Sequence, residues 1–271
     1  MVGGGGARQV NMIRVAARSG ACATAEALSG PASAMSCAEC HTQVETPEQR
    51  TKRIWKNADA VAFDVDSTVC QDEAIDELAK FLGVGEAVAN VTRQAMNGRT
   101  RFRDALRARL EVMRPSYDQL EMYVKETKPR LTPGIRELVD ALHKRGTPVF
   151  LVSGGFRRLI FPVADMLGID RKRVYANEIL FDVNKDYAGF DESELTSDSG
   201  SKDVGKPAVM GLLKKQGYKQ LVMVGDGATD LEAAPPADAF IGFGGNQIRE
   251  AVRSKADWYV TDFEVLREAL E

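Results

Sequence analysis

Five short apolar runs without polar alternation most constrain the fold of this 271-residue chain. Strands that alternate keep one face in water, whereas unbroken apolar strands are buried on both faces, as in a parallel sheet covered by helices. The runs span residues 60–63, 149–152, 221–224, 239–241 and 258–260, and helical patterns between them cover 135–144, 159–167 and 209–215. This order predicts a Rossmann-like α/β domain with a doubly wound parallel sheet, in which ligands lie beyond the carboxyl ends of the strands.

About 80 residues separate the first two runs, which is far more than one crossover helix requires. Two apolar stripes with helical spacing lie in this interval, within residues 75–82 and 102–113. We therefore expect a helical cap over residues 72–130, inserted into a domain that spans residues 52–271. A hairpin is expected further along, within residues 179–190.

Histidine is scarce, because His41 and His143 are the only two in the chain. This argues against a Ser-His-Asp triad or a two-histidine zinc site. A net charge of -3 argues against a broad basic surface for nucleic acid, and no run of about 18 apolar residues suggests a membrane span. Catalysis would have to rely on carboxylates, lysine, serine or metal-bound water.

Residues 1–46 differ in composition from the rest of the chain. They contain a Gly3–Gly6 run, many alanines and serines, three arginines, and no acidic residue before Glu26. Acid-poor leaders that contain arginine and serine resemble organelle transit peptides. We expect a transit peptide addressed to a plastid rather than a mitochondrion. The alternative is a disordered leader on a cytoplasmic protein.

Reactive side chains follow the apolar runs. Asp64 and Asp66 follow the first run, and Asp226 and Asp230 follow the third. Because the carboxyl ends of parallel strands share one edge, we expect these four carboxylates to lie together. Their repulsion requires a cation, and oxygen ligands favour Mg²⁺ with a nearby lysine. Ser153–Gly155 follow the second run, where glycines let backbone N–H groups approach an anion at a helix start.

In this order, each after a predicted buried strand, these motifs resemble those of the haloacid dehalogenase superfamily. They are most similar to the phosphoserine phosphatase family of eukaryotic type. The segments that carry the resemblance are Phe63–Val69, Ile75–Ala79, Leu131–Leu138, Ser153–Phe156, Gly225–Asp230 and Pro235–Asn246. The resemblance covers roughly residues 54–271. It implies Mg²⁺-dependent hydrolysis of O-phospho-L-serine to L-serine and phosphate, the last step of phosphorylated serine biosynthesis, through an aspartyl-phosphate.

The resemblance also assigns roles around the phosphate. Asp64 would be the nucleophile and Asp66 the general acid and base. The Asp64 carboxylate, the Asp66 carbonyl and Asp226 would hold Mg²⁺, while Asp230 would support the metal shell and orient the lysine. The remaining phosphate contacts would come from the lysine and from Ser153, Gly154, Gly155 and Thr229.

Two lysines are candidates for the position beside the phosphate. The family pattern reads Ser-Gly-Gly-Lys before a helix, whereas residues 199–206 here read Ser-Gly-Ser-Lys-Asp-Val-Gly-Lys and offer Lys202 and Lys206. Lys206 follows a glycine and begins a helical pattern, and its separation from Asp226 fits the family better. We therefore favour Lys206.

In the cap, the resemblance assigns Glu73 to the substrate ammonium and Arg109 to its carboxylate. Arg109 lies on an apolar stripe, where an unpaired guanidinium would be costly. Met96 and Asn97 would lie near the phosphate, and Asn97 stands where the family has glycine. The partner is then a small-molecule substrate, and for assembly we consider a homodimer.

Two other readings stay open at this point. A related small-molecule phosphatase or phosphotransferase of the same superfamily would share Asp64 and Asp66 and differ in the acceptor, although Glu73 and Arg109 favour an amino-acid phosphate. A non-enzymatic domain for phospho-Asp signalling or binding would need neither an 80-residue cap nor an acid/base residue two positions after the phosphorylated aspartate.

Overall fold

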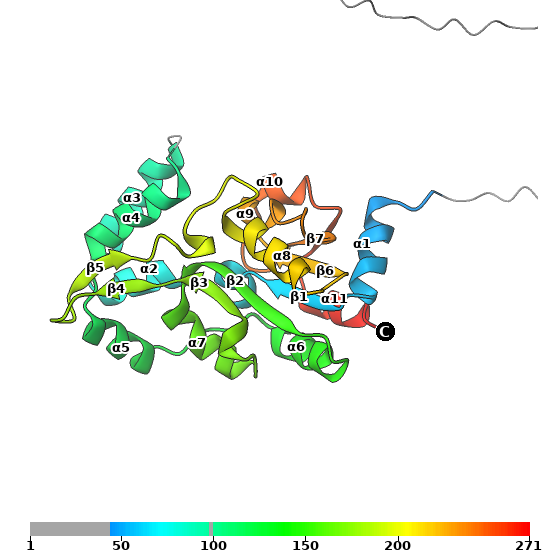
Figure 1. Ribbon diagram of the computed structural model, residues 1–271, viewed down its shortest axis with the longest axis horizontal. Helices are drawn as coiled ribbons and strands as arrows, with labels where there is room; N and C mark the ends of the chain where they lie inside the picture. Colours follow the sequence, from blue (N-terminus) through cyan, green and yellow to red (C-terminus); the bar gives the residue numbers. More distant parts are fainter. Residues whose placement is uncertain (1–43, 98–99) are drawn as a thin grey trace, which may run out of the picture. The chain divides into compact units, whose positions relative to one another are not determined.

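A six-stranded parallel sheet forms the centre of the computed structural model, which describes residues 44–97 and 100–271. The strand order is β3-β2-β1-β6-β7-β8 (Figure 1). The strands are β1 (Ala60–Phe63), β2 (Val149–Phe156), β3 (Val174–Asn177), β6 (Leu221–Gly225), β7 (Ala239–Phe243) and β8 (Trp258–Val260). The predicted doubly wound parallel sheet is confirmed. The sequence pattern missed β3, because its Val-Tyr-Ala-Asn run is short and ends in a polar residue.

Helices cover both faces of the sheet, which explains why its strands tolerate no polar alternation. Along β1, Val61 and Phe63 belong to the apolar cluster on one face, whereas Ala60 and Ala62 belong to the cluster on the other. The first cluster includes side chains of α1 (Pro47–Lys56), α6 (Ile135–Lys144), α7 (Arg157–Met166) and α11 (Phe263–Glu268). The second includes side chains of α8 (Gly205–Lys215) and α10 (Glu250–Arg253) and lies beside α9 (Ala228–Leu231).

Most of the residues between β1 and β2, from α2 to α5, form a helical cap (Figure 1). Its helices are α2 (Ala74–Phe81), α3 (Gly85–Asn97), α4 (Phe102–Met113) and α5 (Tyr117–Glu126), all within the expected interval 72–130. The expected hairpin is also present, as antiparallel β4 (Ile179–Phe181) and β5 (Tyr187–Phe190). Tyr187 and Phe190 share one apolar cluster with Leu106 and Leu110 of α4. The cap core is therefore built from two distant parts of the chain.

Helix α1 belongs to the core, although the sequence placed the domain boundary at residue 52. Thr46 begins the helix with a capping box, in which its hydroxyl accepts from Gln49 N–H at 3.2 Å and its own N–H donates to the Gln49 side chain at 2.9 Å. Trp55 is fully buried and donates from Nε1 to the Leu266 carbonyl of α11 at 2.9 Å. Residues 1–43, most of the expected leader, lie outside the described residues.

The centre of the sheet is the point where the strand order changes direction. From β1 the chain continues to β2 and β3 on one side, whereas β6 lies on the other side of β1 and leads to β7 and β8. Ligands of open α/β sheets bind outside the carboxyl ends of the strands at such a switch point. Asp64 follows β1 and Asp226 follows β6, so the fold brings both to this position.

Trp55→Ala should lower the free energy of unfolding by about 3–5 kcal/mol, because it opens a cavity and leaves the Leu266 carbonyl without its donor. Arg50→Ala, on the exposed side of the same helix, should change it by less than about 0.5 kcal/mol. Urea denaturation of both variants measures the difference. Equal stabilities would contradict the docking of α1 on α11.

Candidate active site

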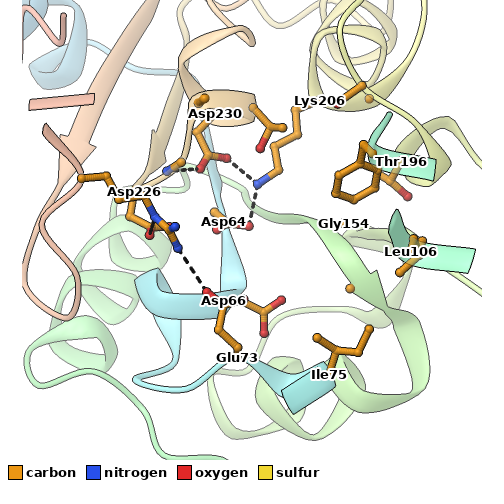
Figure 2. Close-up of a pocket in the computed structure, with 18 of the residues that line it drawn as sticks. Asp64, Asp66, Glu73, Ile75, Leu106, Gly154, Thr196, Lys206, Asp226 and Asp230 are labelled. Atoms are coloured by element: carbon orange, nitrogen blue, oxygen red, sulfur yellow. Dashed lines mark hydrogen bonds and ion pairs between the residues drawn. The ribbon is translucent and has the colours of Figure 1, made fainter. Parts of the chain in front are cut away.

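The carboxyl end of β1 places two carboxylates at one cavity of about 380 Å³ (Figure 2). Asp64 directly follows the strand, and its backbone N–H donates to a carbonyl of β6 at 2.9 Å. A tight turn, Val65–Val69, comes next, and Asp66 in that turn lines the same cavity. Its two carboxylate oxygens accept hydrogen bonds from the Ala74 N–H at 2.8 Å and the Ser153 hydroxyl at 3.4 Å.

Asp226 and Asp230 complete an acidic cluster with Asp64. One oxygen from each carboxylate lies within 4.8 Å of the others, and all three side chains are buried. A buried, all-oxygen set with this charge fits a hard divalent cation. The structure thus brings together the Asp64, Asp226 and Asp230 carboxylates, as expected. Asp66, the fourth expected carboxylate, lines the same cavity but lies outside this group of oxygens.

Lys206 lies inside the acidic cluster, whereas Lys202 is exposed on the preceding loop. The Lys206 ammonium is 2.6 Å from Asp64 Oδ1 and also pairs with Asp230 (Figure 2). Gly205 begins α8 with a φ of 69°, and a Cβ there would lie 2.8 Å from the Asp198 carbonyl oxygen. Glycine is therefore needed at the turn that directs Lys206 into the cavity.

The loop at the end of β2 brings Ser153, Gly154 and Gly155 to the same cavity. Gly154 and Gly155 line it, and Ser153 is fully buried beneath them. The Gly155 N–H donates to the Ser153 hydroxyl oxygen at 2.8 Å. A Cβ at Gly154 would lie 2.6 Å from Phe102 Cζ of the cap, so glycine permits the close approach of α4 to this loop.

Burial and like charge perturb the acids of the site. Burial raises the pKa of Asp64 well above its usual value, and Asp230 adds to this effect while Lys206 opposes it. Burial, followed by the charge of Glu73, raises the pKa of Asp66 to about 7. Burial disfavours the charged form of Lys206, but Asp230 and Asp64 outweigh it and raise the pKa of its ammonium. A bound divalent cation would favour the ionised form of Asp64.

Glu73 and Arg109 line the cavity from the cap side. Glu73 directly precedes α2 and accepts from the Ser67 hydroxyl at 2.9 Å. Arg109 lies on α4, and its Nε donates to the Ala105 carbonyl at 3.3 Å. Burial lowers the pKa of Arg109, although nearby acids oppose this effect. The cap thus presents one negative and one positive group to the cavity, and Ile75, Phe102 and Leu106 line its apolar part.

Arg249 is a site residue that the sequence analysis missed. Its Nε is 2.7 Å from Asp226 Oδ2 and its Nη2 is 3.2 Å from Glu73 Oε1. Arg249 follows the loop after β7, so it comes from the same sheet edge as the other reactive residues. Polar residues after β1, β2 and β6 were expected at the site because parallel strands end at one edge of the sheet. The same reasoning applied to the loop after β7 points to Arg249.

The other expected contacts have different outcomes. Thr229 lines the cavity at the start of α9. Met96 and Asn97 end α3, and their side chains lie outside the described residues. Asn246, the last residue of the Pro235–Asn246 segment, donates from Nδ2 to the Thr132 hydroxyl at 2.7 Å and to the Ser67 carbonyl at 3.1 Å. It thereby fixes the turn that carries Asp66.

Comparison with known proteins agrees with this geometry. A family model described as haloacid dehalogenase-like hydrolase matches residues 58–238. A phosphoserine phosphatase of Bos taurus is 54% identical over 81% of this chain and 96% of its own length. The chain belongs to the phosphoserine phosphatase family of the haloacid dehalogenase-like hydrolases. The family expected from the motifs is therefore confirmed.

Two further members of this family show the range of its sequences and structures. The chloroplastic phosphoserine phosphatase of Arabidopsis thaliana is 49% identical over 83% of this chain and 76% of its own length. A solved phosphoserine phosphatase, described as a phospho-aspartyl intermediate analogue, has a TM-score of 0.62 at 27% identity. That match covers 78% of this chain and 98% of the solved one. The shared fold thus persists at half the sequence identity of the curated relatives.

Mg²⁺ should raise the melting temperature, because an ion that binds only the folded carboxylate cluster stabilises it by about 2.7 kcal/mol at 100 times its Kd. Asp226→Asn should lose most of this increase, since it removes a ligand. Asp203→Asn, at an exposed position, should keep it. Differential scanning calorimetry with and without Mg²⁺ tests this, and an unchanged increase in Asp226→Asn would contradict the metal site.

Proposed function

We propose that this protein hydrolyses O-phospho-L-serine to L-serine and phosphate, using Mg²⁺ and an aspartyl-phosphate on Asp64. One observation carries the proposal: the cavity has a nucleophile–lysine pair, Asp64 and Lys206, at its base and opposite charges, Glu73 and Arg109, on its cap side. Such a cavity suits a phosphomonoester whose organic part has both an ammonium and a carboxylate. The phosphoserine phosphatases of the same family support this assignment.

Each carboxylate after β1 has a separate task in this reaction. Asp64 attacks phosphorus, and the departing serine oxygen takes a proton from the Asp66 carboxyl. Water then attacks the aspartyl-phosphate and gives a proton to the Asp66 carboxylate, which restores Asp64 and releases phosphate. The Lys206 ammonium and the Ser153 hydroxyl stabilise charge on the phosphoryl oxygens. Asp64, the Asp66 carbonyl and Asp226 would hold Mg²⁺, which would neutralise charge between the anionic substrate and the acids.

Recognition of the serine part falls to the cap. The Arg109 guanidinium suits a carboxylate, because it can donate two parallel hydrogen bonds. The Glu73 carboxylate suits an ammonium, which would replace Arg249 as its partner. The apolar side chains of Phe102 and Leu106 line the cavity between these groups and reduce water access.

For the cellular compartment, we propose that residues 1–46 act as a plastid transit peptide. Their acid-poor composition supports this, as does the chloroplastic relative from Arabidopsis thaliana. None of the helices in residues 44–97 and 100–271 is long and apolar enough to cross a membrane. The homodimer stays a prediction.

Phosphate release from O-phospho-L-serine in Mg²⁺, compared with phosphothreonine and sugar phosphates, tests the proposed function. Asp64→Asn should abolish turnover, because an amide is a poor nucleophile, and Asp66→Asn should slow it by about 10²- to 10⁴-fold. Excess chelator should stop the reaction. Turnover of sugar phosphates without phosphoserine would instead identify a related phosphatase, and near-normal turnover by Asp64→Asn would contradict the covalent mechanism.

Lys206→Ala should reduce kcat/KM by at least about 100-fold, because a preorganised cation beside the phosphoryl group is lost. Lys202→Ala is the matched control, four residues earlier and exposed, and should stay within about twofold of the wild type. Steady-state kinetics of both variants measures the contrast. The reverse order of effects would mean that Lys202 reaches the phosphate in the substrate complex.

Arg109→Lys should mainly raise KM for phosphoserine, because lysine cannot reproduce the two parallel hydrogen bonds of a guanidinium. A charged hydrogen bond is worth about 1.5–3 kcal/mol, so kcat/KM should fall by about 10- to 150-fold. An aryl phosphate without a carboxylate should be affected much less. Equal losses on both substrates in one preparation would show that Arg109 supports the fold instead.

A further inference from the structure

Asn177, at the end of β3, is a buried polar side chain that the proposed mechanism does not use, with 0% of its surface exposed. Its Nδ2 donates to the Gly154 carbonyl at 2.8 Å, and its Oδ1 accepts from the Thr196 hydroxyl at 2.9 Å. Thr196 is itself only 3% exposed and lines the active-site cavity (Figure 2). Because both ends of the amide are engaged, Asn177 holds the peptide between Gly154 and Gly155 in one orientation.

The next residue along the chain, Ser197, connects this pair to the cap. Arg103 of α4 donates from Nη2 to the Ser197 hydroxyl at 2.8 Å and from Nε to the Ser197 carbonyl at 3.4 Å. Its Nε is also 3.7 Å from Asp198 Oδ2. Ser197 is 1% exposed, and its hydroxyl donates to the Glu192 carbonyl at 2.9 Å. One guanidinium from the cap thus holds the short helical turn on which Thr196 lies.

The orientation of the 154–155 peptide decides what the Ser153 hydroxyl can do. In this structure the Gly155 N–H donates to Ser153 Oγ, so the hydroxyl hydrogen is directed to another acceptor. Asp66 Oδ2, at 3.4 Å, is that acceptor here, and a phosphate oxygen can take its place. If the 154–155 peptide flipped, its carbonyl would face Ser153 and accept the hydroxyl hydrogen bond, so the hydroxyl could no longer donate to a phosphate. The hydrogen bond from Asn177 to the Gly154 carbonyl opposes this change.

We propose that Arg103, Thr196 and Asn177 are positioning residues, which form a relay from the cap to the 154–155 peptide and keep the Ser153 hydroxyl as a phosphate donor. Helix α4 carries both Arg103 and Arg109, so the same relay sets the spacing between the carboxylate-binding and phosphate-binding parts of the cavity. The relay rests on the proposed function only for the identity of the substrate, because its geometry applies to any phosphomonoester.

Thr196→Val tests the inner part of the relay, since it keeps the shape and removes the hydroxyl. We expect kcat/KM to fall about 10-fold on both phosphoserine and an aryl phosphate, mainly through kcat, because Ser153 acts on the phosphate. Thr196→Ser, which keeps the hydroxyl, should recover activity to within about threefold of the wild type. Equal losses in the valine and serine variants would overturn the relay in favour of simple packing.

Arg103→Ala tests the outer part and should lower kcat/KM about 5-fold on both phosphoserine and the aryl phosphate, mainly through kcat, because it acts through Thr196 on the same peptide. Arg107→Ala is the matched control. Arg107 lies on the same helix and pairs with the Glu192 and Asp104 carboxylates, with no hydrogen bond to Ser197 among the described residues. It should stay within about twofold of the wild type. Equal effects of the two alanine variants would overturn a specific role for Arg103.

A double-mutant cycle decides whether the contacts act as one unit. Arg103→Ala with Thr196→Val should lose little more than the larger single loss, whereas Arg107→Ala with Thr196→Val should show the product of both. If the fold-losses of Arg103→Ala and Thr196→Val multiply in the double variant, the relay is overturned. Asn177→Ala, which removes the donor to Gly154 without adding a charge, replaces Thr196→Val if that variant fails to fold. If the wild-type enzyme hydrolyses the aryl phosphate but not phosphoserine, the proposed substrate is wrong. The double-mutant cycle measured on the aryl phosphate would still test the relay.

Discussion

Repulsion among the buried carboxylates of Asp64, Asp226 and Asp230 is the constraint on which the rest of the structure depends. Two like charges 4 Å apart cost about 4 kcal/mol even at an effective dielectric constant of 20. The fold offsets this cost with Lys206 between Asp64 and Asp230, with the Gly227 N–H on Asp230 at 2.9 Å, and with Arg249 on Asp226. Two cationic side chains face three carboxylates, so a net negative charge remains in the cluster. This charge suits the binding of a divalent cation.

The sheet and the cap divide recognition between them. The sheet edge is built from consecutive strand ends whose registers are fixed by backbone hydrogen bonds, so it suits the phosphate, which is common to many substrates. Two linkers join the cap to the sheet. They pair through an isolated antiparallel β-bridge between Cys70 and Leu131 and through the Asp72–Arg130 ion pair. Its Glu73 and Arg109 side chains suit the amino-acid part of the proposed substrate. The relay through Thr196 links these two parts.

The charges of the cap and the sheet are already matched without substrate. Glu73 lies near Arg249, and Arg249 also serves Asp226. We propose that ligand binding exchanges partners: a substrate ammonium would replace Arg249 beside Glu73, and a divalent cation would replace it beside Asp226. Of these three groups only the Asp226 carboxylate is buried, and the exchange would leave it paired throughout, which avoids the cost of an unpaired buried charge.

The sequence by itself determined the sheet, the family and the acids of the site, because these depend on local order. An unbroken apolar run followed by Asp64 and Asp66 predicts a strand end with two carboxylates, and parallel strands bring such ends to one edge whatever lies between them. Gly205 before a helical pattern, together with the family-like separation from Asp226, favoured Lys206 over Lys202. Arg249 had a weaker signal, its position after the loop that follows β7, and Asn177 had none, because β3 was not predicted. Their importance comes from contacts with Glu73 and Gly154, more than a hundred and about twenty residues away. Only the tertiary structure decided those contacts. They depend on how the cap and the strand ends pack together, and the spacing of residue types along the chain carries no information about that packing.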